Sequence, residues 1–241
     1  MTTFVLVHGA WQGASTWDLV VPRLRNAGHL VYTPTLLGLG ANAHRLSPDV
    51  TLDMHIQDVL GVINYENLRD ITLVGHSYAG MIITGVAEQA RERIARLVYA
   101  DAFVPGDGQS ALQLMPERFQ SAFRNQALTE GDGWRLLGSE KRLDLWGLKP
   151  GPARDFVRSK LCDFSLKCFE QPICLPTNAA ATLKRVYIAC VSEEYPARPV
   201  FAQFAERAKA EGWPYFELPT GHDCHVEQPE EFSRLLLTLV G

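Results

Sequence analysis

The most informative segment of the chain is Leu73-Val74-Gly75-His76-Ser77-Tyr78-Ala79-Gly80. An apolar run leads into it and apolar residues at helical spacing follow it, which predicts a strand, a tight turn and a helix. Such a turn holds a serine in a strained conformation and projects its hydroxyl above the sheet, as in a nucleophile elbow. Ala79 stands where the usual pattern has a second glycine, but alanine is the smallest side chain after glycine. We predict Ser77 as a nucleophile, and the alternative is a plain glycine-rich turn.

On both sides of this segment, short apolar runs alternate with stretches of helical periodicity. This alternation predicts a parallel sheet that is covered by helices on both faces. Helices are expected over 52–63, 83–90 and 200–208 and from Pro229 onward, where proline suits the first helical position. The six candidate strands are 4–7, 29–32, 70–74, 96–100, 185–190 and 214–218.

One long region interrupts the alternation. Residues 106–181 lack clear core strands and are rich in aromatic side chains, and they are too many for a plain loop. We predict that they form a helical cap over the carboxyl edge of the sheet, inserted into a core made of 1–105 and 182–241. The alternative is a second small domain with its own core.

Composition excludes several classes of protein. The chain has 241 residues, 46% of them hydrophobic, and a net charge of −4. With no basic stripe, neither nucleic acid nor an anionic membrane is expected as a partner. No apolar run reaches the roughly 18 residues of a membrane span, and no signal peptide is recognisable. Five cysteines, an odd number, are typical of reduced thiols in a cytoplasmic protein.

Two further motifs supply groups that a serine nucleophile needs. His8-Gly9-Ala10 follows the first strand, and the N–H groups of Ala10 and Tyr78 are the candidate donors to an oxyanion. A general base must accept the serine proton, and two histidines follow the last strand. We favour His222 over His225, because the helix at Pro229 limits how far the loop can fold back.

The acid that orients the histidine has two candidates. Asp101 comes directly after the strand at 96–100, and Glu193 follows the strand at 185–190. A carboxylate at either strand end can accept the Nδ1–H of the histidine. We favour Asp101, because an apolar strand precedes it without a polar spacer, whereas an adjacent Glu pair is often a solvated turn.

Together these motifs resemble the α/β-hydrolase superfamily, and within it the small methyl-ester esterase and hydroxynitrile lyase group. The resemblance spans nearly the whole chain and implies an α/β-hydrolase fold, with Ser77 as nucleophile and His222 as base. It also implies Ala10 and Tyr78 as oxyanion donors. The acid does not transfer cleanly, since esterases of this group usually carry an Asp where this chain has Ser192-Glu193-Glu194. Gly9 and Asp223 replace a Thr and a Lys of the lyases, which argues against cyanohydrin cleavage.

We therefore predict a carboxylic ester hydrolase that works through an acyl-enzyme, without a cofactor or a metal ion. The expected partner is a small-molecule ester with a hydrophobic group, and a homodimer is left open. Trp11, Trp134 and Trp146 are the candidate substrate-binding residues. The alternatives are C–C bond hydrolysis or lyase chemistry on the same triad, and a receptor-like protein that binds a ligand without turning it over.

Overall fold

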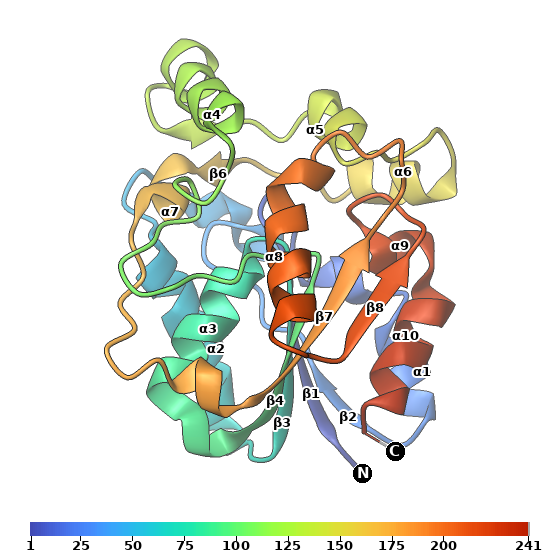
Figure 1. Ribbon diagram of the computed structural model, residues 1–241. Helices are drawn as coiled ribbons and strands as arrows, with labels where there is room; N and C mark the ends of the chain where they lie inside the picture. Colours follow the sequence, from blue (N-terminus) through green and yellow to red (C-terminus); the bar gives the residue numbers. More distant parts are fainter. Residues whose placement is uncertain (241) are drawn as a thin grey trace.

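The computed structural model describes residues 1–240 and is built on one parallel sheet of six strands in the order β2-β1-β3-β4-β7-β8 (Figure 1). All six strands coincide with apolar runs of the sequence, so the predicted sheet is confirmed. Strand β3 is buried at every position, because it lies in the middle of the sheet with helices on both faces. The strands are β1 Thr3–Val7, β2 Leu30–Tyr32, β3 Ile71–His76, β4 Ile94–Ala100, β7 Lys184–Cys190 and β8 Tyr215–Leu218.

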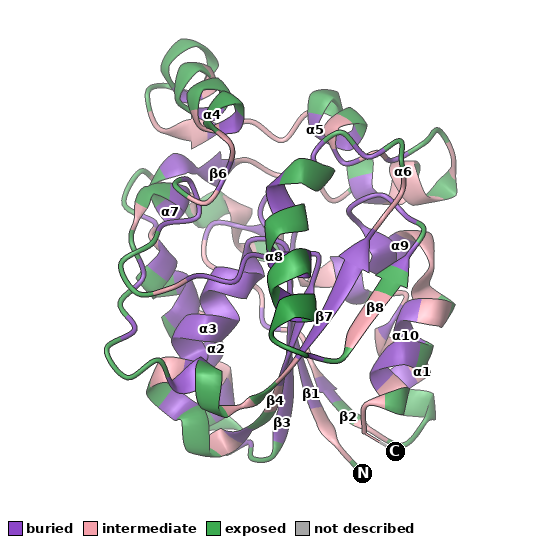
Figure 2. Ribbon diagram, viewed as in Figure 1, coloured by how far each residue is buried: buried purple, intermediate pink, exposed green. Residues whose placement is uncertain are grey.

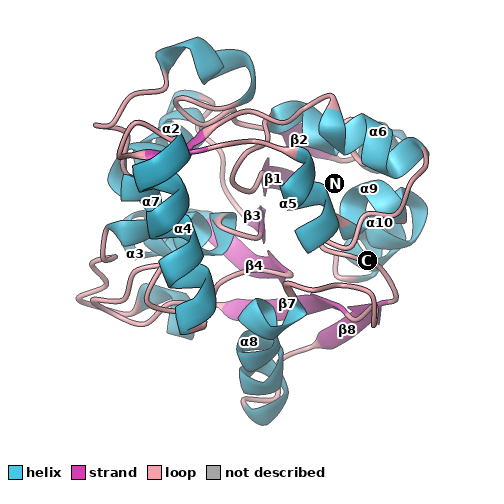
Figure 3. Cartoon of the chain, turned by 90° about the horizontal axis from the view of Figure 1, so that it is seen from above, coloured by secondary structure: helices cyan, strands magenta, loops and turns pink. Residues whose placement is uncertain are grey.

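Helices cover both faces of this sheet (Figures 1 and 3). Helices α2 and α3 pack together on one face, and α8 packs on β7 and β8. Helices α1 and α10 pack together on the other face. The bounds are α1 Val21–Asn26, α2 Leu52–Tyr65, α3 Ala79–Ala90, α8 Arg198–Ala210, α9 Cys224–Glu227 and α10 Pro229–Thr238, with short 3-10 turns at Ala14–Trp17, Gly40–Arg45, Arg91–Arg93 and Ala179–Thr182.

Most of the region 106–181 lies above the carboxyl ends of the strands, and the segment after α7 runs down to the start of β7 (Figure 1). Four helices and two very short strands form there, and the strands β5 and β6 pair antiparallel outside the main sheet. No pattern in the sequence indicates these two strands. The division into core and cap stays a prediction. The elements are α4 Glu117–Glu130, β5 Arg135–Leu136, α5 Glu140–Leu145, α6 Pro152–Arg158, β6 Phe164–Ser165 and α7 Leu166–Glu170.

Burial follows the layers (Figure 2). The strands of the sheet are mostly buried, whereas α8 buries one side, with Val200, Phe201 and Phe204, and exposes the other. Apolar side chains on helices and sheet leave water together, and this is the main force that holds the layers in place. Within the described residues, none of the helices is both long and apolar enough to cross a bilayer.

Candidate active site

Ser77 occupies the sharp turn between β3 and α3. Its φ of +58° lies in the left-handed region, which a non-glycine residue adopts only when its surroundings hold it there. The Ser77 N–H donates to the Ala100 carbonyl at 3.2 Å, and its carbonyl accepts the N–H groups of Gly80 and Phe103. A Cβ on Gly80 would lie 2.0 Å from the Phe103 carbonyl oxygen, so only glycine allows this close packing. The turn therefore has the strained geometry that a nucleophile elbow requires.

His222 and Asp101 form a buried pair beside this turn. The Nδ1 of His222 lies 2.7 Å from Asp101 Oδ2, and both side chains are almost fully buried. Asp101 follows β4 directly, with a φ of +42°, and its N–H donates to the Ile188 carbonyl of β7. Glu193, the other candidate acid, is exposed on the loop after β7. The structure thus brings Asp101, and not Glu193, to the imidazole.

The backbone and ring of His222 are held from several sides. Its N–H donates to the Trp146 carbonyl at 2.8 Å, and its carbonyl accepts the Nε2–H of His76 at 2.9 Å. The Phe201 ring is nearly parallel to the imidazole, with ring centroids 4.8 Å apart. Because Nδ1 is engaged by Asp101, Nε2 is the nitrogen that remains for Ser77.

Tyr195 contacts both Asp101 and His222, and sequence reasoning missed it. Its hydroxyl lies 2.8 Å from Asp101 Oδ2 and 2.8 Å from His222 Nδ1. It is buried on the same loop as the exposed Glu193. The only sequence signal is an aromatic residue directly after the Glu193-Glu194 pair, and that signal does not show where the hydroxyl points.

The loop after β1 lies directly against the nucleophile. A Cβ on Gly9 would lie 3.0 Å from Ser77 Cβ. Among residues 1–240, neither the Ala10 N–H nor the Tyr78 N–H donates to another protein group. His8 braces the loop: its Nε2 accepts the Leu36 N–H, so its Nδ1 carries the proton and donates to the Gly9 carbonyl at 2.9 Å. Burial lowers the pKa of His8 to about 4, so the ring stays neutral.

Ser77 and His222 share the wall of one apolar pocket. Trp11 and Trp146 line it, whereas Trp134 is half-buried elsewhere and is not brought to it. Trp134 instead lies under the Arg135 guanidinium. The remaining lining is apolar and comes from both the sheet and the region above it: Phe103, Met115, Phe119, Phe123, Leu145, Phe169, Ala197, Val200 and Phe201.

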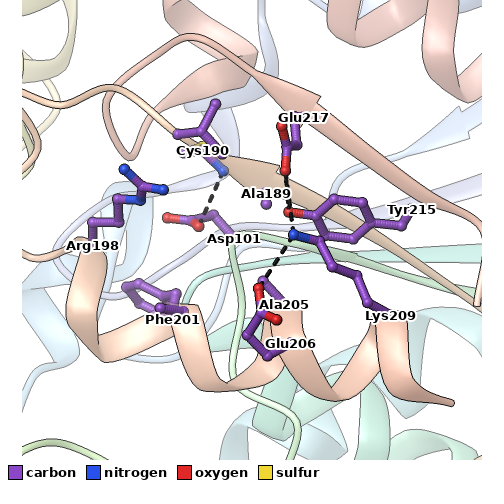
Figure 4. A pocket seen from close by; sticks show the side chains of 12 residues that line it. Asp101, Ala189, Cys190, Arg198, Phe201, Ala205, Glu206, Lys209, Tyr215 and Glu217 are labelled. Carbon is purple, nitrogen blue, oxygen red and sulfur yellow. Dashed lines mark hydrogen bonds and ion pairs between the residues drawn. The ribbon is translucent and has the colours of Figure 1, made fainter.

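A second hollow lies behind Asp101, between β7, β8 and α8 (Figure 4). Its lining mixes apolar and charged side chains, and Lys209 contacts Glu206 at 3.2 Å and Glu217 at 3.5 Å. The Tyr215 hydroxyl donates to Glu217. This hollow touches Asp101, but its lining includes neither Ser77 nor His222.

Three buried side chains next to His222 leave polar atoms without partners. His76, Asp223 and His225 each offer one ligand atom, and these atoms lie within 4.8 Å of one another. Burial lowers the pKa of His225 to about 3, so its ring is neutral, and Nε2 faces the Thr16 hydroxyl. Buried polar atoms normally have hydrogen-bond partners, so these three atoms form a polar cluster of their own beside His222.

Comparison with known proteins agrees with this fold. The chain is 39% identical to the "Carbendazim hydrolyzing esterase" of Nocardioides sp. (strain SG-4G), over 99% of this chain and 100% of the relative. It is 26% identical to the "Polyneuridine aldehyde esterase" of Rauvolfia serpentina, over 98% and 94% of the two chains.

Among solved structures, an "Extracellular alpha/beta-hydrolase from Paenibacillus species" superposes with a TM-score of 0.86 at 25% identity, covering 99% of this chain and 98% of that one. Arabidopsis thaliana "Methylesterase 2" is 29% identical over 67% of this chain and 60% of its own length. The resemblance to methylesterases inferred from the sequence is confirmed. A model of the "Alpha/beta hydrolase family" matches residues 4–235. The chain belongs to the alpha/beta hydrolase family, and it is a carboxylic ester hydrolase.

Proposed function

We propose that Ser77, His222 and Asp101 act as a catalytic triad that hydrolyses a hydrophobic carboxylic ester through an acyl-enzyme. The observation that carries this proposal is the buried 2.7 Å contact between His222 Nδ1 and Asp101 Oδ2, at the wall of the pocket that also holds Ser77. This contact keeps the proton on Nδ1 and leaves Nε2 as the base that faces the pocket.

In the first half-reaction, Ser77 Oγ attacks the carbonyl carbon of the ester while His222 Nε2 accepts the serine proton. The carbonyl oxygen becomes an oxyanion, and the N–H groups of Ala10 and Tyr78 donate to it. His222 then gives its proton to the departing alkoxide, which leaves as an alcohol, and the acyl group stays on Ser77.

In the second half-reaction, water takes the place of the alcohol. His222 Nε2 accepts a proton from this water, and the resulting nucleophile attacks the acyl-enzyme at the same carbonyl carbon. Collapse of the second oxyanion breaks the bond to Ser77 Oγ, which recovers its proton from His222. The carboxylic acid leaves, and the enzyme returns to its starting state.

The pocket supports an apolar substrate group. Apart from Ser77 and His222, its lining offers only carbon, indole and thioether surface, so an alkyl or aryl group gains about 25 cal/mol for each Å² it buries. The Nocardioides relative is named for hydrolysis of carbendazim. Carbendazim therefore belongs in the substrate panel, together with alkyl and aryl esters.

The test is a panel of p-nitrophenyl esters of increasing acyl length, assayed with wild type and Ser77→Ala. Wild type is expected to turn over, and the variant to lose turnover while remaining folded. An organophosphonate should add its mass to wild type at Ser77 and not to the variant. Hydrolysis that survives in Ser77→Ala would overturn the assignment of the nucleophile. Tight ligand binding without turnover in wild type would favour the receptor-like alternative.

A further inference from the structure

We propose that Tyr195 is a positioning residue of the triad, whose hydroxyl holds the Asp101 carboxylate and the His222 imidazole in their relative orientation. This inference rests on the proposed triad and adds a fourth residue to it. The motivating geometry is a triangle, in which the Tyr195 hydroxyl lies 2.8 Å from Asp101 Oδ2 and 2.8 Å from His222 Nδ1, while the last two atoms are 2.7 Å apart.

The proton positions in this triangle follow from the groups themselves. An ionised carboxylate only accepts hydrogen bonds, so the single Tyr195 proton points to Asp101 Oδ2. The Nδ1–H of His222 points to the same oxygen. The Tyr195 oxygen therefore turns a lone pair toward Nδ1–H, and its hydroxyl supports both the carboxylate and the imidazolium that forms during the reaction.

Asp101 needs this support because it is a buried charge with few partners. It is 2% exposed, and within residues 1–240 no Lys or Arg forms an ion pair with it. Its other oxygen, Oδ1, accepts only the Cys190 N–H, at 3.3 Å. A buried carboxylate is costly unless donors satisfy it, and Tyr195 supplies one of three. Burial raises the pKa of Tyr195 well above its usual range, so the hydroxyl keeps its proton.

The fold fixes Tyr195 in this place. The residue is 2% exposed and follows β7 on the loop that leads into α8. Gly147, just after α5, packs against it: a Cβ there would lie 3.0 Å from Tyr195 Cα and 2.7 Å from the Glu194 carbonyl oxygen. The Tyr195 ring also stacks near the imidazole, with centroids 5.6 Å apart. A side chain confined in this way acts on geometry and charge, and not as a mobile gate.

The experiment compares Tyr195→Phe with wild type. Loss of the hydroxyl should lower kcat about 10- to 100-fold, the usual effect of removing a hydrogen bond to a charged group, with KM changed less than about threefold. The rate of organophosphonate labelling at Ser77 should fall by the same factor. Tyr187→Phe is the matched control, because this buried hydroxyl donates to the Ala102 carbonyl and not to the triad. Its kcat should stay within about threefold of wild type.

A double-mutant cycle separates positioning from a general structural role. In an Asp101→Asn background there is no carboxylate to support, so adding Tyr195→Phe should change the labelling rate less than about threefold. The proposal is overturned if Tyr195→Phe retains wild-type kcat, if it changes only KM, or if it costs the same factor in both backgrounds. A wild type that is labelled but hydrolyses no ester would refute the proposed function and leave the cycle valid. A wild type that is not labelled would overturn both.

Discussion

Replacing Asp101 with Asn removes the charge of the proposed triad acid and keeps its shape. The Cys190 N–H donates to Oδ1, so the amide oxygen of the variant takes that position and the NH₂ group takes the position of Oδ2. An NH₂ group donates and cannot accept. It therefore faces the Tyr195 oxygen and His222 Nδ1 as a donor.

An NH₂ donor at this position favours the wrong tautomer of His222. With Nδ1 accepting, the ring proton moves to Nε2, which then cannot take the proton of Ser77. The same substitution in a serine protease lowers kcat by roughly 10⁴, which corresponds to about 5.5 kcal/mol of transition-state stabilisation. We expect a decrease of about 10³- to 10⁴-fold here, since the carboxylate is also buried and also contacts the Nδ1 of the histidine.

The assay is steady-state hydrolysis of a p-nitrophenyl ester, with circular dichroism and a melting curve to show that the variant is folded. Glu193→Gln is the matched control. Because this carboxylate is exposed, its replacement should change kcat less than twofold. The reasoning is refuted if Asp101→Asn stays within tenfold of wild type, or if Glu193→Gln is the variant that loses activity.

Three further predictions concern the loops, the pH dependence and the pocket. Gly147→Ala should lower the free energy of unfolding by about 2–4 kcal/mol and also lower kcat, because φ is +74° and the added Cβ would meet Glu194 and Tyr195. The control is Gly133→Ala, with φ +86° and open space around it, which should lower the free energy of unfolding by only about 1–2 kcal/mol. Thermal melting measures both losses, and equal losses would contradict this reasoning. Burial raises the pKa of Glu227 from 4.5 to about 7, so the folded state binds this proton more tightly and the free energy of unfolding falls as pH rises between these values. Glu227→Gln should therefore raise Tm more at pH 8 than at pH 5, and an equal gain at both would count against the buried charge. Phe123→Ala should raise kcat/KM for esters with long acyl chains about tenfold relative to acetate esters, because Phe123 lines the pocket. Trp134→Ala is the control and should leave this ratio of kcat/KM values unchanged. If Phe123→Ala does not change the ratio, the acyl group binds elsewhere.

The core of the fold was predictable because its strands are short apolar runs. Strand β3 is buried throughout, so its sequence has no polar alternation to confuse it with a surface element. The two-residue strands β5 and β6 are too short to show any periodicity, and they exist only because distant segments meet. Local pattern therefore predicts the sheet but not the small pairings above it.

In the candidate site, too, local sequence patterns predicted some residues, whereas contacts between distant segments place the others. Ser77 lies in a local pattern, strand then turn then helix, and its φ of +58° follows from that pattern. Tyr195 reaches Asp101 across 94 residues of sequence, so nothing near it in the chain indicates its role. The three tryptophans show the same limit: an aromatic-rich segment predicts apolar surface, but Trp146 faces the pocket and Trp134 does not. Orientation depends on packing between segments, which a single sequence does not display.

The end of α5 links the pocket to the triad. The Leu145 carbonyl accepts the Ala197 N–H from the loop that carries Tyr195, and the Trp146 carbonyl accepts the N–H of His222. Both residues also line the pocket. A substitution that moves this segment therefore changes the shape of the pocket and the position of the His222 imidazole together, and should alter kcat along with substrate specificity.

Helix α4 is different. Its Phe119 and Phe123 line the pocket, but the backbone of α4 makes no hydrogen bond to the loops of Tyr195 or His222 among the described residues. Changes on this helix can reshape the acyl site while the triad geometry is kept by α5. Variation in substrate preference should therefore be tolerated best on α4, and the segment from Leu145 to Gly147 should be the least tolerant part of the region above the sheet.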